Sequence, residues 1–235
     1  MNMVSTEIVD DALLLIEQNF YFLHAGEFFA LWSRREDLSS AVPNRLIKVF
    51  EGGFPYTFDG RLIQTVLTHE YATPDDQASL LEYFIEFNAF RGIMMGMIEA
   101  VQDGSPFGRY WNQRLGKKRF ENLIDIVAFI RNVLSHNTHA EIRLNEKDYS
   151  GRRKRIERMG RDLRVRFSLQ YYNTLPEINV PSTTYGIDLQ VDFGSLKPQT
   201  PFLSVVSMGD LMLLSELCFN LSLIYRNQAQ TAVLD

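Results

Sequence analysis

The spacing of apolar residues is the feature that most limits how this chain can fold. Over long stretches, apolar side chains recur every three or four residues, which is the period of a helix with one buried face. The period changes to two only between Arg164 and Phe193, where apolar and polar residues alternate as they do in half-buried strands. The sequence therefore predicts a mainly α-helical fold, a helical bundle with a β-hairpin inserted before its C-terminal helix.

Local signals place the ends of these elements. A residue that can cap a helix precedes three of the long helical stretches, and Gly52-Gly53 is a stop signal for a short one. The expected helices are one that begins near residue 6 and others over about 45–50, 73–102, 118–135 and 207–225. The connections over about 54–60 and before residue 118 are expected to be loops.

The two expected strands carry opposite charges on their outer faces. The first, over about 165–171, presents arginines, and the second, over about 187–193, presents aspartates, which favours antiparallel pairing. Residues 140–144 are a candidate third strand. We expect a single domain over 1–235, with residues 140–200 forming an insertion made of the β-hairpin and a basic loop.

Composition excludes several classes of protein. A hydrophobic fraction of 46% supports a continuous core, and one cysteine, Cys218, permits neither an internal disulfide nor a multi-cysteine zinc site. No secretory signal and no membrane span are apparent in the sequence, so we expect a cytoplasmic protein with no membrane partner. No dinucleotide, phosphate-loop or metalloprotease motif is present, and we expect neither a cofactor nor a bound metal.

The formal charge of −5 is unevenly distributed. Nine basic and three acidic residues lie between Lys147 and Arg166, so this segment carries +6 and the remainder carries −11. Such a concentration suggests a local anionic partner. The expected RNA-binding residues are Arg152, Arg153, Lys154, Arg155 and Arg158. The same charges would also suit docking of an acidic antitoxin, or a solvated loop without a ligand.

The residues most suited to chemistry lie near the end of the expected helix over 118–135. Asn132, Ser135, His136 and His139 recur at helical spacing on one polar face, with Arg131 on its flank. An imidazole both accepts and donates protons at neutral pH, and a guanidinium grips two phosphate oxygens. This set therefore suits phosphodiester cleavage, with Ser135 and His139 as candidate auxiliary residues. The alternative is an ordinary polar helix surface.

The segment Arg131-Asn132-Val133-Leu134-Ser135-His136 resembles the signature of the HEPN superfamily, which is an arginine, usually followed by a polar residue, with four to six residues between the arginine and a histidine. Members of that superfamily are small helical bundles, and many are metal-independent RNases of toxin–antitoxin, phage-defence and CRISPR systems. The resemblance implies that Arg131 and His136 are catalytic, with Asn132 as their polar companion.

The resemblance also implies a homodimer, because pairs of HEPN subunits bring two copies of the motif into one cleft. Some members carry a tyrosine two residues after the histidine that a partner enzyme modifies, and Thr138 stands there in this chain. The leading interpretation is an endoribonuclease that acts as a toxin or phage-defence effector, with an antitoxin or regulatory protein as partner. The alternatives are a catalytically inactive RNA-binding or adaptor module and a nucleotide-sensing subunit of a defence complex.

Overall fold

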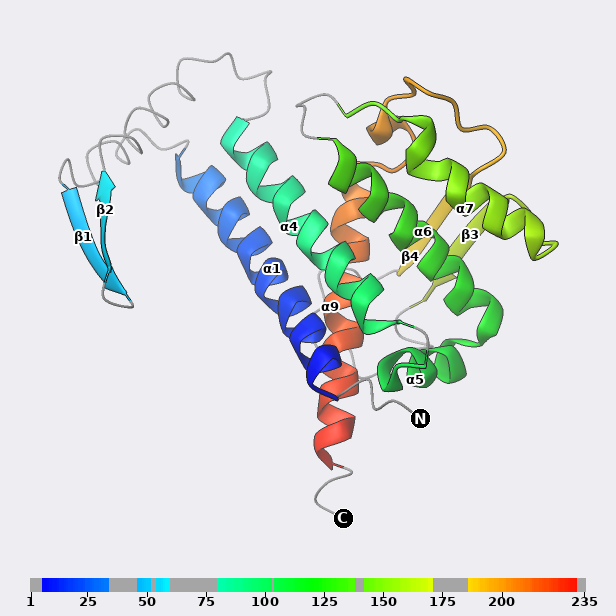
Figure 1. The fold of residues 1–235 in the computed structure, drawn as a ribbon, viewed down its shortest axis with the longest axis horizontal. Coiled ribbons are helices and arrows are strands. Elements are labelled where there is room, and N and C mark those ends of the chain that lie inside the picture. Colours follow the sequence, from blue (N-terminus) through cyan, green and yellow to red (C-terminus); the bar gives the residue numbers. More distant parts are fainter. Residues whose placement is uncertain are drawn as a thin grey trace. The chain divides into compact units, whose positions relative to one another are not determined.

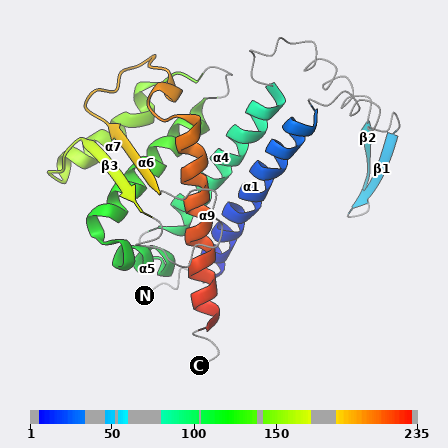
Figure 2. The same cartoon turned by 180° about the vertical axis from the view of Figure 1, so that it is seen from behind.

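The computed structural model describes residues 6–33, 46–51, 54–59, 80–102, 104–137, 142–170 and 186–231. It divides into two compact units, one of Met1–Tyr21 with Phe87–Asp235 and the other of Phe22–Glu86. The prediction of a mainly helical chain with an antiparallel hairpin before the last helix is confirmed (Figure 1, Figure 2). The helices are α1 (Thr6–Ser33), α4 (Leu80–Ala100), α5 (Pro106–Leu115), α6 (Lys117–His136), α7 (Glu146–Arg158) and α9 (Met208–Thr231).

The first unit is built around the apolar faces of α1, α4, α6 and α9. Leu13 of α1, Phe90 of α4, Ile130 of α6 and Leu214 of α9 are all fully buried. The two views show α1 and α4 side by side (Figure 1, Figure 2). Their close approach depends on Gly96, because a Cβ added there would lie 2.8 Å from the backbone oxygen of Ala12.

The predicted β-hairpin forms from β3 (Arg164–Leu169) and β4 (Ile187–Asp192), which pair antiparallel. Its alternate residues are buried and exposed as expected, and the exposed Arg166 forms an ion pair with Asp188 on the neighbouring strand. Beyond β4, the rings of Phe193 and Phe202 pack edge-on against Phe129 of α6. This contact fixes the hairpin segment to the core of the bundle.

The basic segment is a helix, although the sequence predicted a loop. Asn145 and Asp148 form a capping box that begins α7, the 13-residue helix Glu146–Arg158. Only three of its side chains, Asp148, Tyr149 and Ile156, are buried. An apolar stripe this sparse gives almost no periodic signal, so the helix depends on its cap and on polar contacts to α6.

Three other expectations need correction. Residues 106–115 form α5, capped by Ser105, whose Oγ accepts a hydrogen bond from the Gly108 backbone, where a loop was expected. In the second unit, β1 (Leu46–Glu51) pairs antiparallel with β2 (Phe54–Asp59), so the expected helix over 45–50 and the loop after it are wrong. A single bridge between Arg143 and Pro201 stands where a third strand was suggested. The helix start predicted at 73–76 lies outside the described residues.

One helix of the described chain, α9, is long and apolar enough over Met208–Gln228 to cross a membrane by length and composition alone. Within the structure 61% of its apolar window is buried against other elements. The core helices of soluble proteins meet the same criterion, so the length and composition of α9 are weak evidence for a membrane span.

Gly96→Ala is expected to destabilise the protein by about 1–3 kcal/mol, because the new methyl group meets the α1 backbone, which cannot move aside without repacking. Gly151→Ala in α7 is the matched control. Nothing lies within 4 Å of a Cβ at Gly151. Because alanine loses less backbone entropy on folding than glycine does, this change should stabilise α7 by about 0.5–1 kcal/mol. Urea unfolding followed by circular dichroism measures both, and an unchanged midpoint for Gly96→Ala would show that α1 and α4 do not pack as described.

Cys218 is expected to resist thiol reagents in the folded protein. It is fully buried in α9, and burial raises the pKa of its thiol to about 12, so the reactive thiolate is scarce at pH 8. Labelling with a disulfide reagent should be slow in buffer and rapid in urea above the unfolding midpoint. Fast labelling in buffer would contradict this placement of α9.

Candidate active site on helices α6 and α7

Helix α7 lies antiparallel along the polar face of α6. At the end of α6, His136 contacts Asp148 in the first turn of α7. Further back on α6, Asp125 pairs with Arg152, which lies one turn later on α7. Of the polar face that the sequence predicted on α6, Asn132 and His136 contact α7 and Ser135 is exposed. Figure 1 shows α6 and α7 as neighbouring helices.

His136 and Asp148 form a hydrogen-bonded pair at the outer edge of this contact. The Nδ1 atom of His136 lies 3.0 Å from Oδ1 of Asp148, a carboxylate that is 0% exposed. Because an ionised carboxylate only accepts hydrogen bonds, Nδ1 must carry the proton. A neutral imidazole then presents Nε2 as its acceptor, on a side chain that is 38% exposed. This is the arrangement that prepares a histidine to act as a general base.

The second oxygen of Asp148 is held by the chain around it. The backbone N–H of Asn145 donates to Oδ2 at 2.7 Å, and the side chain of Asn137 lies 3.5 Å from the same atom. The amide of Asn145 in turn donates to the side-chain oxygen of Asn137 at 3.2 Å. This network fixes the carboxylate, and with it the orientation of the His136 ring.

The end of α6 is fastened to α4 by Arg91. Its Nε donates to the backbone oxygen of Leu134 at 2.7 Å, and Nη2 lies 3.5 Å from the backbone oxygen of Asn137. These carbonyls are among those that a helix end leaves without intrahelical partners. Arg91 therefore holds the turn of α6 that carries His136.

Arg131 has an uncommitted guanidinium. It is half-buried, and within the described part of the chain it makes no hydrogen bond or ion pair. Its charge reaches α7: burial lowers the pKa of Arg152, and neighbouring Arg155 and Arg131 lower it further, while Asp125 raises it. Arg131 therefore lies near other cations and remains available to an anion.

The other members of the predicted catalytic set differ in position. The amide of Asn132 lies 3.4 Å from the backbone oxygen of Asp148, so this residue supports the contact with α7. Ser135 is exposed one residue before His136. His139 and Thr138 lie outside the described residues.

The five predicted RNA-binding residues lie on α7 and divide into two groups. Arg152 donates to Asp125, and Arg153 donates to the backbone oxygens of Phe193 and Leu196 while stacking over Tyr149. Both residues therefore hold α7 against neighbouring parts of the structure. The other three, Lys154, Arg155 and Arg158, are exposed.

Sequence reasoning assigned no role to the two buried carboxylates that organise the site. Asp125 is 3% exposed and pairs with Arg152 at 3.0 Å and with Arg161 at 2.8 Å. Asp148 occupies the last position of an Asn-x-x-Asp sequence, and that capping-box spacing was the available signal for its place at a helix start. Its pairing with His136 depends on how two helices cross, which no local spacing encodes.

Three hollows among the described residues lie around the first half of α6, two of them against β3 and one against α7, and none of these three is lined by Arg131 or His136. No group of three or more histidine, cysteine, aspartate or glutamate side chains that could hold a metal ion occurs among the described residues.

Comparison of the chain with protein families, with curated proteins and with solved structures finds no match. The functional argument therefore depends on the geometry of α6 and α7 and on the motif.

Asp125→Asn is expected to destabilise the protein by about 3 kcal/mol, because it removes the buried carboxylate that pairs with Arg152 at 3.0 Å and leaves Arg161 with the more distant Glu121, at 3.7 Å. Asp188→Asn is the control for the same chemistry at the surface. The Arg166–Asp188 pair is 61% and 50% exposed, so that change should cost less than about 1 kcal/mol. Chemical denaturation compares the two, and equal losses would argue against a buried ion network between α6 and α7.

Proposed function

We propose that this protein is a metal-independent endoribonuclease of the HEPN type, with Arg131 and His136 at its active site. The observation that carries the proposal is the His136–Asp148 pair, which leaves Nε2 as a proton acceptor on an exposed ring near an uncommitted arginine. The resemblance of residues 131–136 to the HEPN signature assigns RNA as the substrate.

In the proposed reaction, Nε2 of one His136 removes the proton of an RNA 2′-hydroxyl. The 2′-oxygen attacks the adjacent phosphorus, and the bond to the 5′-oxygen breaks, leaving a 2′,3′-cyclic phosphate. The 5′-oxygen leaves with a proton from a second imidazole. Arg131 binds the non-bridging oxygens and stabilises the negative charge that builds up on them. Asp148 holds the imidazole in the required tautomer and stabilises it when it is protonated.

The same chemistry favours a homodimer. One His136 cannot be deprotonated base and protonated acid at once, and the other histidine of this segment, His139, lies outside the described residues. Arg131 and His136 are five residues apart, which is about 140° around a regular helix, so one α6 does not direct both at one phosphate. Two copies of α6 facing each other across a two-fold axis would supply both imidazoles and both guanidiniums.

The biological setting follows only from the resemblance: a cytoplasmic toxin or phage-defence effector, restrained by an antitoxin or regulatory protein. A second candidate function is a catalytically inactive RNA-binding or adaptor module. It is favoured by the contacts of Asn132 and His136 with Asp148, which give both residues a structural role in joining α6 to α7.

The test is incubation of purified protein with mixed RNA in EDTA, followed by analysis of product ends. Wild-type protein should generate 2′,3′-cyclic phosphates, and His136→Ala should lower the rate by about 10²- to 10⁴-fold, the usual contribution of a general acid or base. Arg131→Ala should lower it comparably. Asp148→Asn should lower kcat more than it changes KM, because the asparagine holds the wrong tautomer.

Lys197→Ala, at an exposed lysine outside the α6–α7 contact, is the control for loss of one positive charge and should keep wild-type activity. Thermal unfolding of every variant separates loss of catalysis from loss of fold. If RNA stays intact at high protein concentration, or if His136→Ala cleaves as fast as wild type, the nuclease proposal is wrong. Intact RNA that is nevertheless bound would favour the adaptor.

A further inference from the structure

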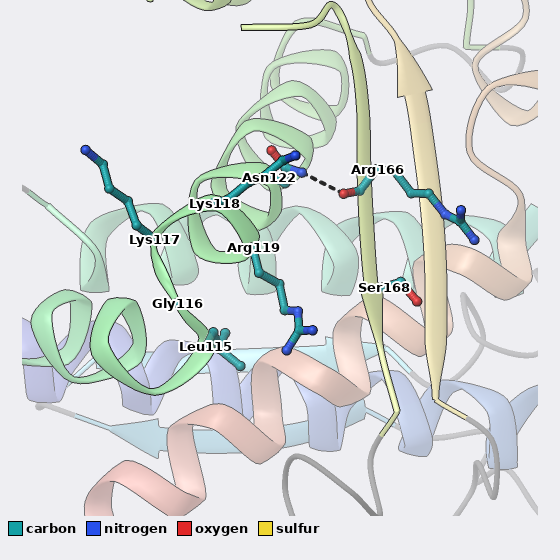
Figure 3. Close-up of a pocket in the computed structure, with 8 residues that line it drawn as sticks. All are labelled: Leu115, Gly116, Lys117, Lys118, Arg119, Asn122, Arg166 and Ser168. Carbon is teal, nitrogen blue, oxygen red and sulfur yellow. Dashed lines mark hydrogen bonds between the residues drawn. The ribbon is translucent and has the colours of Figure 1, made fainter.

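Three adjoining hollows, here together called the groove, lie around the first half of α6, away from His136. One of these hollows, of about 680 Å³, lies between the first turns of α6 and strand β3 (Figure 3). It shares Lys118, Asn122 and Arg166 with a second hollow, which shares Glu121 and Arg161 with a third. Because neighbouring hollows have lining residues in common, they adjoin one another around the first turns of α6.

The walls of this groove are rich in cations. The hollow drawn in Figure 3 is lined by four basic residues and by no acidic one. The remaining two hollows add more arginines together with three acidic residues, of which Asp125 is already paired with two arginines. The basic residues of the whole groove are Lys117, Lys118, Arg119, Arg152, Arg155, Arg161, Arg164 and Arg166.

Three of these cations, Lys118, Arg119 and Arg155, make no ion pair within the described residues. Arg166 is paired with Asp188, and Lys117 lies 3.9 Å from Glu121. Lys118 and Arg119 are exposed and make no ion pair within the described ranges of the chain. Figure 3 shows Arg119 extending into the space between α6 and β3, with Lys118 beside Asn122.

The position of these residues is unfavourable for the isolated helix. Lys117, Lys118 and Arg119 occupy the first turn of α6, where the helix dipole favours negative charge, and the turn contains no acidic residue. Gly116 precedes them without a side-chain cap. A bound anion would offset the repulsion among these three cations. Without an anion, no negative side chain in this turn compensates for their clustering.

The far end of the groove combines cations with apolar surface. Phe120, Ile124 and Met159 line the third hollow together with Arg152 and Arg155. Arg131 lies near Arg152, since its charge lowers the pKa of that guanidinium. From Lys118 to Arg131 the helix rises about 20 Å. A flexible polyanion with flat apolar groups between its charges matches this sequence of surfaces better than an acidic peptide does.

We infer that this groove binds the phosphodiester backbone of a single-stranded nucleic acid, with Lys118 and Arg119 as phosphate anchors and the apolar end in contact with bases. Binding there does not require cleavage, so the inference is independent of the proposed nuclease. It differs from the expectation drawn from the basic run of α7, whose exposed residues Lys154 and Arg158 do not line the groove.

The test is fluorescence anisotropy of wild-type protein with a labelled thymidine 12-mer and a 2′-O-methyl uridine 12-mer, neither of which can be cleaved through a 2′-hydroxyl. Titrations at three salt concentrations give affinity and salt slope. Lys118→Ala/Arg119→Ala should weaken binding about tenfold and lower the slope of log K against log salt by about 1.4, as loss of two phosphate contacts predicts.

Lys154→Ala/Arg158→Ala removes the same charge from α7 and should leave both quantities within twofold of wild type. Equal losses in the two double variants would mean general charge attraction and would overturn the groove. A larger loss of affinity in the α7 variant would place nucleic acid on α7 instead.

Poly-glutamate of matched charge is the competitor. If it binds as tightly as the oligonucleotides, and its affinity falls as much in the α6 variant, the groove is a binding site for acidic protein. Equal affinity for both 12-mers supports backbone recognition; preference for one shows that the sugar is read as well.

Discussion

The structure around the site depends on two buried carboxylates at the contact between α6 and α7. A buried aspartate is stable only when it is fully hydrogen-bonded or paired with a cation. Asp125 meets this requirement through Arg152 and Arg161, and Asp148 through Asn145 and His136. Neither α6 nor α7 satisfies these groups alone, so the two helices determine each other's position. This explains why α7, with only three buried side chains, is held in place.

The same requirement connects structure to function. Asp148 begins α7 as part of its capping box, and its Oδ1 atom accepts a hydrogen bond from His136. The histidine thereby gains a fixed ring orientation and a fixed tautomer, which a solvated surface histidine lacks. A carboxylate that is needed to start a helix thus also prepares an imidazole for proton transfer. The hydrogen bond between His136 and Asp148 is the same whether it serves to join the two helices or to prepare the imidazole, so the geometry of His136 alone does not distinguish these roles.

The sequence predicted those elements whose apolar period is strong. The helix ending at His136, the helix opened by Ser207 and Asp210, and the two alternating strands all lie where the pattern placed them. Prediction failed where tertiary contacts replace a periodic signal. Helix α7 is mostly polar, and α5 is marked only by its Ser105-Pro106 start. The pair Gly52-Gly53 was taken as a helix stop, yet two glycines between alternating segments are equally a hairpin signal, and the flanking strands pair.

The candidate site was predictable only in part, for a related reason. The spacing of Arg131 and His136 is local and can be recognised in a sequence, but the partner of His136 lies on another helix. The distribution of charge shows most clearly that a sequence does not reveal which residues are paired in the fold. The basic run between Lys147 and Arg166 is conspicuous by count, but several of its charges are committed: Arg152 and Arg161 to Asp125, Arg153 to backbone oxygens, and Arg166 to Asp188.

A guanidinium that already has a carboxylate beside it contributes little field to an approaching anion, because the pair is close to neutral at any distance larger than its own separation. The surface that attracts a polyanion is therefore set by cations left over after internal pairing, and not by their density along the chain. By that criterion, within the described residues, the short cluster Lys117-Lys118-Arg119 keeps two unpaired cations, and the run on α7 keeps Lys147, Lys154, Arg155 and Arg158, but only the α6 cluster lines a hollow with all its members. It also lies on the same helix as Arg131, so that one rigid element would carry both the residues that grip a strand and the residues proposed to cut it.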